Sequence, residues 1–147
     1  MPIYTHILCA ADFSDLGTSA ARRAVELARL CGARLTVLHV VEYFPGERSN
    51  QRIAPEDQDP AQYEARRAHE RLAELVRELD FTTAVARVEF CENAAWQKIC
   101  EVAQAEQADL LVLGSRGLHA AAAWLGATAN AVQQHARRDV LTVHRVG

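Results

Sequence analysis

The sequence lacks the features that mark exported and membrane proteins. No apolar segment among its 147 residues approaches the length that a membrane-spanning helix needs. The start of the chain, Met-Pro-Ile-Tyr-Thr-His, has no basic region followed by a long apolar core, so no secretory signal is predicted. We therefore expect a cytoplasmic protein with no membrane partner.

Paired cysteines are also missing. Cys9, Cys31, Cys91 and Cys100 form no Cys-x-x-Cys motif, and without an export signal they are expected to be reduced thiols of the core. No spacing between these cysteines and the six histidines fits a zinc pattern. The sequence therefore predicts no metal centre.

Positive charge is not in excess. The 16 lysines and arginines are outnumbered by 19 acidic residues, and the formal net charge of −3 argues against a nucleic-acid partner bound through a basic surface. Half of the residues are hydrophobic and 24% are charged, which is an ordinary globular balance. A chain of this length is most simply one domain, so we expect a single domain over residues 1–147.

Two phosphate-binding signatures are absent. Gly-x4-Gly-Lys-Ser/Thr does not occur, and residues 12–17 read Asp-Phe-Ser-Asp-Leu-Gly where a dinucleotide-binding protein would have Gly-x-Gly-x-x-Gly. These absences argue against ordinary kinases, GTPases and dinucleotide dehydrogenases.

What the sequence does contain is an alternation of strand and helix patterns. Apolar runs and alternating patterns predict strands over residues 4–11, 34–41, 82–90, from 110, and 139–146. Apolar positions at helical spacing predict helices over about 16–31, 61–79, 94–105 and 128–136. Gly32 is expected to end the first helix and Asn93 to cap the third. The third strand is half exposed and so predicted at a sheet edge, and residues 42–60 are predicted as a long surface loop.

This alternation predicts an α/β protein with a doubly wound, five-stranded parallel sheet and helices on both faces. In the Rossmann-like order 3-2-1-4-5, strands one and four lie side by side, and the connections that leave them depart to opposite faces. A ligand crevice is expected at the carboxyl ends of these two strands. Asp12 ends the first strand and Gly114 ends the fourth, so both are expected to line it.

The stretch from Asp109 to Val132 holds most of the candidate site. Its apolar strand stops at Gly114-Ser115-Arg116-Gly117, and Gly126 precedes the last helix. Glycines at a strand end let a ligand approach the backbone closely, and the N–H groups of a helix start favour anions. A carboxylate facing them has the parts of a nucleotide site. The alternative is that these glycines only turn the chain.

Three segments carry a resemblance to the universal stress protein family along nearly the whole chain. They read HILCAADFSD, AVELARLCGARLTVLHVV, and ADLLVLGSRG followed by LGATANAVQQHARRDVLTVHRV. The resemblance implies the sheet order 3-2-1-4-5, a homodimer and a role in stress tolerance in place of a metabolic reaction. We expect no enzyme, although slow ATP hydrolysis or autophosphorylation stays open.

ATP-binding members of the family share Gly-x-x-Gly, nine residues, and then Gly-Ser/Thr. Here eight residues separate Gly117 from Gly126, and Ala127 stands where the hydroxyl is usual, followed by Thr128 as a replacement or as a helix cap. This shortened spacing resembles the A-type branch, whose members often do not hold ATP. The resemblance assigns ribose binding to Asp12 and an adenine contact to the backbone of Val41.

The candidate nucleotide site, for ATP or a related adenine nucleotide, thus combines residues at three strand ends and one helix start. They are Ala11, Asp12, Val41, Gly114, Arg116, Gly117, Gly126, Ala127 and Thr128. No catalytic residue is assigned. The first functional hypothesis is a regulator that responds to a nucleotide in this site.

The second hypothesis is a stress-response homodimer that acts through a protein partner and holds no nucleotide. The last strand ends the chain, is apolar on both faces, and leaves an outer edge that a second copy can pair with antiparallel. The candidate interface residues are Val140, Leu141, Thr142, Val143, His144 and Arg145.

Overall fold

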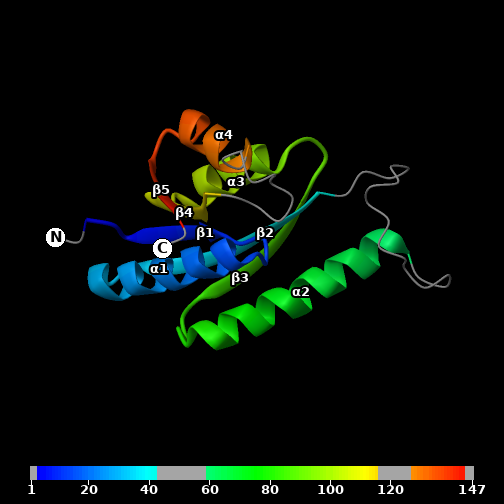
Figure 1. Ribbon diagram of the computed structural model, residues 1–147, viewed down its shortest axis with the longest axis horizontal. Coiled ribbons are helices and arrows are strands. Elements are labelled where there is room, and N and C mark those ends of the chain that lie inside the picture. The colour runs from blue at the N-terminus through cyan, green and yellow to red at the C-terminus, as the bar shows by residue number, and fades with distance from the viewer. Residues whose placement is uncertain (1–2, 43–58, 116–126, 145–147) are drawn as a thin grey trace.

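The computed structural model describes residues 3–42, 59–115 and 127–144, and strands and helices alternate through them (Figure 1). The strands are β1 (His6–Ala10), β2 (Arg34–Glu42), β3 (Val85–Cys91), β4 (Leu110–Gly114) and β5 (Asp139–Val143). The helices are α1 (Asp15–Cys31), α2 (Pro60–Leu79), α3 (Ala95–Glu106) and α4 (Ala127–His135). Each predicted strand and helix is confirmed in type and place.

The strands form one parallel sheet in the order β3-β2-β1-β4-β5, which confirms the predicted fold class. β1 is central, and its last residue, Ala10, pairs with Leu38 of β2 and Leu113 of β4. Helices α1 and α2 cover one face of the sheet, and α3 and α4 cover the other (Figure 1). β3 is an edge strand, as its half-exposed pattern predicts.

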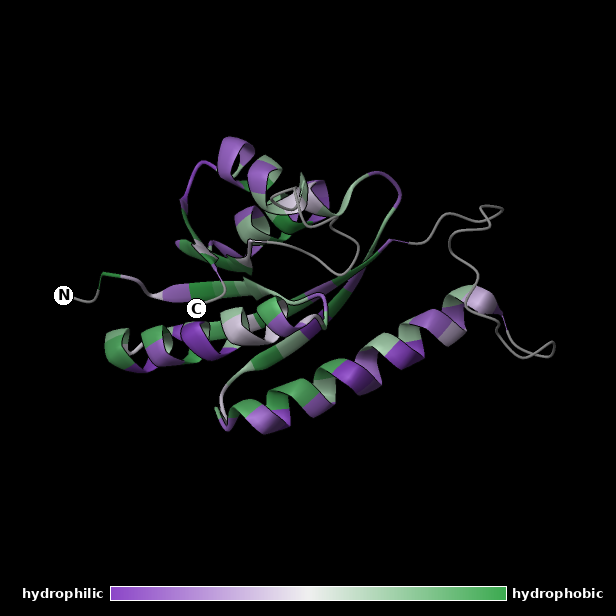
Figure 2. Ribbon diagram, in the orientation of Figure 1, coloured by the Kyte–Doolittle hydropathy of each residue, from purple (hydrophilic) through white to green (hydrophobic). Residues whose placement is uncertain are grey.

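Two hydrophobic layers hold the helices on the sheet. Successive side chains of a strand point to opposite faces, so Ile7 and Cys9 of β1 pack under α1 and α2 while Leu8 packs under α3 and α4. This double burial explains why β4, and β1 from Ile7 onward, read as unbroken apolar runs. The helices are hydrophobic on one side only, and Figure 2 shows hydrophobic and hydrophilic residues alternating along α1 and α2.

Both ends of α1 follow from local chemistry. Ser14 caps α1 by accepting a hydrogen bond from the N–H of Gly17, and Gly32 ends α1 in the left-handed conformation at φ 64°. The prediction that Asn93 caps α3 is wrong. Ala94 occupies the cap position in an extended conformation and makes no side-chain cap bond, because α3 begins one residue later than predicted.

Several boundaries also differ from the prediction. β3 begins at Val85 because residues 81–84 close a turn after α2, in which the N–H of Ala84 donates to the carbonyl of Phe81 at 3.0 Å. β5 ends at Val143, and the predicted continuation over 145–146 lies outside the described residues. β2 runs through Glu42, and the predicted loop after it lies mostly outside them as well. None of the described helices is both long and apolar enough to cross a membrane.

Candidate functional site

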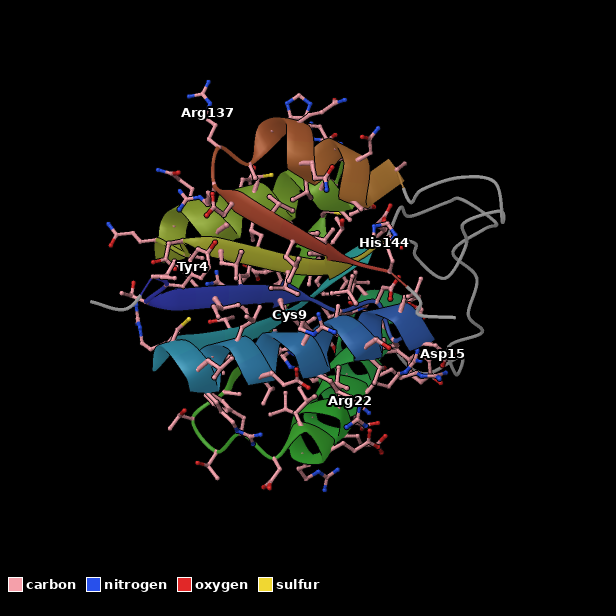
Figure 3. All side chains as sticks on the ribbon, turned by 60° about the vertical axis from the view of Figure 1, so that its left-hand side comes forward. Tyr4, Cys9, Asp15, Arg22, Arg137 and His144 are labelled. Atoms are coloured by element: carbon pink, nitrogen blue, oxygen red, sulfur yellow. The ribbon has the colours of Figure 1, made fainter. Side chains whose placement is uncertain are left out.

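The carboxyl ends of β1 and β4 lie side by side, as the sequence predicts. Leu113 pairs with Ala10, so Asp12 follows β1 close to where Gly114 ends β4. β1 leads to α1 on one face of the sheet and β4 leads to α4 on the other. Figure 3 shows the molecule from another side. Asp15 and His144 mark the end where the carboxyl ends of β1 and β4 lie, and Tyr4 and Arg137 mark the opposite end. The connections that follow β1 and β4 thus diverge at the position where open α/β sheets bind ligands.

The first turn of α1 orients the carboxylate of Asp12. Its Oδ1 accepts hydrogen bonds from the N–H of Ser14 at 3.1 Å and from the hydroxyl of Ser14 at 2.5 Å. A Cβ atom on Gly17 would lie 2.5 Å from the same Oδ1. The absence of a side chain at Gly17 therefore makes room for this carboxylate, a requirement that no local sequence pattern indicates.

Three further side chains surround the backbone at Asp12. His39 donates from Nδ1 to the carbonyl of Ala11 at 2.6 Å, since a carbonyl can only accept. The ring of Phe13 lies 4.3 Å from the His39 ring, and the guanidinium carbon of Arg71 lies 4.3 Å from the Phe13 ring centroid. Phe13 itself has φ 66°, a conformation that a bulky residue adopts only at some cost. No local sequence pattern signals such a cluster, because its members come from β2, α2 and the turn after β1.

Gly114 has a packing role that needs no ligand. A Cβ atom there would lie 3.1 Å from the carbonyl carbon and the Cβ of Leu16, in the first turn of α1. The next residue, Ser115, is buried and donates its N–H to the carbonyl of Val143 at 2.9 Å. The missing side chain at Gly114 thus allows α1 to approach the end of β4. This packing role differs from the two roles that the sequence suggests for Gly114, a ligand contact or a simple turn.

The last two residues of the candidate nucleotide site, Ala127 and Thr128, lie at the start of α4. The helix begins at Ala127, which is exposed, and Thr128 is its second residue, so the reading of Thr128 as the helix cap is wrong. Arg116, Gly117 and Gly126 lie outside the described residues. Val41 is buried at the end of β2, where it pairs with Phe90 of β3.

β5 forms the second edge of the sheet. Val140 packs with the α3 and α4 layer, and Leu141 and Val143 pack with the α1 and α2 layer, so both faces are apolar as predicted. Because Ser115 bonds to the carbonyl of Val143, the peptide groups of Val143 face β4. The groups of the alternate residues Val140 and Thr142 then face the outer edge, where no strand of the described chain pairs with them. Arg145 lies outside the described residues.

The cysteines are all free, and Cys9 and Cys91 are buried. Burial, followed by the nearby charge of Asp12, raises the pKa of the Cys9 thiol to about 12, which keeps it protonated. No group of three potential ligands for a metal ion occurs within residues 3–42, 59–115 and 127–144.

Comparison with known proteins agrees with this architecture. The family model described as Universal stress protein family matches residues 3–144. Universal stress protein A homolog 1 of Coxiella burnetii is 31% identical over 140 residues, which cover 95% of this chain and 96% of that protein.

Similar solved structures include universal stress protein UspA from Lactobacillus plantarum, with a TM-score of 0.75, 26% identity, and coverage of 95% of this chain and 97% of that one. A universal stress protein in complex with cAMP has a TM-score of 0.72 at 24% identity, covering 97% and 99%. The universal stress protein from Archaeoglobus fulgidus in complex with dAMP has a TM-score of 0.64 at 22% identity, covering 97% and 98%.

The fold and the switch point between β1 and β4 define a Rossmann-like α/β protein. Together with the match over nearly its whole length, they show that the chain belongs to the universal stress protein family.

Proposed function

We propose that this protein is a stress-response regulator that binds an adenine nucleotide, ATP or a related one, at the carboxyl ends of β1 and β4. The observation that carries the proposal is the position of the Asp12 carboxylate. It lies where the connections after β1 and β4 diverge, and Ser14 orients it. Ribose hydroxyls donate hydrogen bonds well to such a carboxylate. The two similar proteins solved with cAMP and dAMP support an adenine nucleotide as the ligand class.

In this proposal the nucleotide extends from β2 to α4. The backbone of Val41 meets the adenine, Asp12 binds the ribose, and the free N–H groups at the start of α4 receive phosphate oxygens. The hydroxyl of Thr128 supplies a further donor in the first turn of α4. No step of this function requires a catalytic residue, and the cytoplasmic location stays a prediction from the sequence.

A second candidate function is a homodimer that acts through a protein partner without a nucleotide. The observation that favours it is the role of Gly114, which packs against Leu16 and so needs no ligand to explain it. Both candidates include dimerisation through the outer edge of β5, where Val140 and Thr142 offer backbone donors and acceptors.

The two candidates are separated by the small molecules that the purified protein carries. Protein prepared without added nucleotide is denatured with acid, and the released molecules are identified by mass spectrometry. The first candidate predicts an adenine nucleotide in an amount that approaches one per chain. Release of no adenine nucleotide would favour the dimer that acts through a protein partner.

A further inference from the structure

The cluster of His39, Phe13 and Arg71 has no role in the function proposed above, yet it surrounds the residue on which that function depends. His39 comes from β2, Arg71 from α2, and Phe13 lies between Asp12 and Ser14. All three are half-buried on the face of the sheet that α1 and α2 cover. We call them the Phe13 cluster.

The Phe13 cluster fixes the backbone on both sides of Asp12. On one side, the carbonyl of Ala11 accepts the 2.6 Å hydrogen bond from His39. On the other side, Phe13 keeps its left-handed conformation at φ 66° while its ring contacts both His39 and Arg71. A tilted contact between two aromatic rings and a cation over an aromatic ring are attractive contacts that offset the strain of this conformation.

The left-handed turn at Phe13 has a direct effect on the carboxylate. It brings the N–H and the hydroxyl of Ser14 back onto Oδ1 of Asp12, while the hydroxyl oxygen of Ser14 accepts from Gly17. A change in the backbone conformation at Phe13 would move the donors of Ser14 relative to the side chain of Asp12. The carboxylate would then sample more orientations before it met a ligand.

We infer that Phe13, His39 and Arg71 are positioning residues that hold the carboxylate of Asp12 in the orientation in which it binds ribose hydroxyls. This inference rests on the proposed nucleotide-binding function and deepens it. The cluster contributes through preorganisation, since a carboxylate already oriented by its neighbours loses less freedom on binding. Its loss should therefore weaken the ribose contact specifically, and not the contacts with adenine or phosphate.

The test compares ATP with 2′,3′-dideoxy-ATP, which lacks the ribose hydroxyls. Both affinities are measured by calorimetric titration for the natural chain, Phe13→Gly and Arg71→Ala. Glycine adopts φ 66° without strain, so Phe13→Gly removes the ring and leaves the turn accessible. Arg71→Ala removes the guanidinium and leaves Phe13 in place, which keeps the test valid if Phe13→Gly does not fold.

Arg29→Ala is the matched control. Arg29 also lies over an aromatic ring, that of Phe81 at 5.8 Å, but it stands in the last turn of α1, about 20 Å along the helix from Asp15 at 1.5 Å per residue. Arg29→Ala therefore removes a contact of the same kind, between a guanidinium and an aromatic ring, at the far end of α1.

For the natural chain and Arg29→Ala, we expect ATP to bind at least tenfold more tightly than 2′,3′-dideoxy-ATP. For Phe13→Gly and Arg71→Ala, we expect this ratio to fall to about threefold or less. A ratio that stays tenfold in both variants, including a case in which they bind both nucleotides equally more weakly, would overturn the positioning role. If the natural chain binds no ATP, the proposed function itself is wrong and the inference falls with it.

Discussion

The carboxylate of Asp12 owes its place to two residues that lack side chains. Gly17 leaves room for Oδ1, and Gly114 lets the first turn of α1 approach the end of β4. Neither glycine has the positive φ found at Gly32. Both glycines allow close packing. A substitution at either position should therefore act by displacing the neighbouring atoms, and not through backbone strain.

Gly17→Ala tests this at the carboxylate. Alanine is favoured over glycine in a helix by about 1 kcal/mol, but its Cβ would lie 2.5 Å from Oδ1 of Asp12 and force that side chain away from Ser14. Moving the carboxylate breaks the two hydrogen bonds from Ser14, and hydrogen bonds to a charged group contribute about 1.5–3 kcal/mol each, which outweighs the helix propensity. We expect the free energy of unfolding in urea to fall by about 1–3 kcal/mol, while ATP affinity falls severalfold.

Gly32→Ala provides the contrast for Gly17→Ala. No atom lies within 4 Å of the added Cβ, so the alanine makes no clash. Because φ is +64°, the alanine is held in the left-handed conformation, which lowers the free energy of unfolding by about 1 kcal/mol. We expect lower stability and unchanged ATP affinity. Unchanged affinity in Gly17→Ala as well would show that the position of the Asp12 carboxylate does not matter for binding.

At this scale the sequence predicts which residues end the strands, but not how their neighbours hold them. Asp12 and Gly114 were predictable because strand ends follow from local apolar runs. The conformation of Phe13 and the contacts of Gly17 depend on β2, α2 and the depth of helix packing, which no local pattern encodes.

Among the elements, β1 and β4 are joined at their amino ends by one carboxylate. Oδ2 of Asp109 accepts from the N–H and the hydroxyl of Thr5, both at 2.9 Å, and Oδ1 accepts from the N–H of His6 at 3.0 Å. Desolvation by burial is the largest single influence on this group and raises its pKa. The hydrogen bonds from Thr5 and His6 together outweigh it, so the pKa of Asp109 lies below its ordinary value.

Asp109→Asn should therefore destabilise the fold in a pH-dependent way. A carboxylate whose pKa is lowered by folding stabilises the protein above its unfolded pKa of about 4, and this contribution is lost as the pH falls through the folded pKa. We expect the variant to be less stable by about 1–3 kcal/mol at pH 7. The difference should shrink as the pH is lowered below about 4 in urea unfolding. A difference that stays constant over this range would mean that the charge of Asp109 does not contribute.

β5 allows a matched pair of proline substitutions. Thr142 directs its N–H to the outer edge of the sheet and Val143 directs its N–H to β4. Proline is tolerated at an edge position whose N–H faces outward, but it breaks the ladder where the N–H is paired. We expect Thr142→Pro to be folded and monomeric, and Val143→Pro to be destabilised by about 1–3 kcal/mol through the lost ladder hydrogen bond, as measured by light scattering with size exclusion and by urea unfolding. A folded Thr142→Pro that remains dimeric would place the interface elsewhere.

The sequence predicts the elements better than their ends. Apolar periodicity places the five strands and four helices of the described residues, because burial on one or both faces sets that pattern. The start of β3 at Val85 and the cap at Ala94 differ from the prediction because turn geometry decides them. Whether the N–H of a residue in β5 faces inward or outward depends on its register with β4, which is a tertiary property.

For the whole molecule, connectivity constrains the fold strongly. Alternating strands and helices with right-handed crossovers leave few sheet orders, and the observed order brings Asp12 and Gly114 to one end of the sheet. The candidate site is predictable to the extent that it follows from this topology. Its phosphate-binding part depends on the spacing between Gly117 and Gly126, which lie outside the described residues, and on the start of α4.

The most direct test of nucleotide binding at this end of the sheet is calorimetric titration with ATP of the natural chain, Asp12→Ala and Asp15→Ala. Both variants lose one carboxylate near the start of α1, so Asp15→Ala controls for net charge. Hydrogen bonds to a charged group contribute about 1.5–3 kcal/mol, and 1.4 kcal/mol is a tenfold change in affinity. We expect saturable binding to the natural chain, binding at least tenfold weaker to Asp12→Ala, and a change of less than about threefold in Asp15→Ala. No heat with the natural chain, or equal affinity in Asp12→Ala, would contradict a nucleotide site built around Asp12.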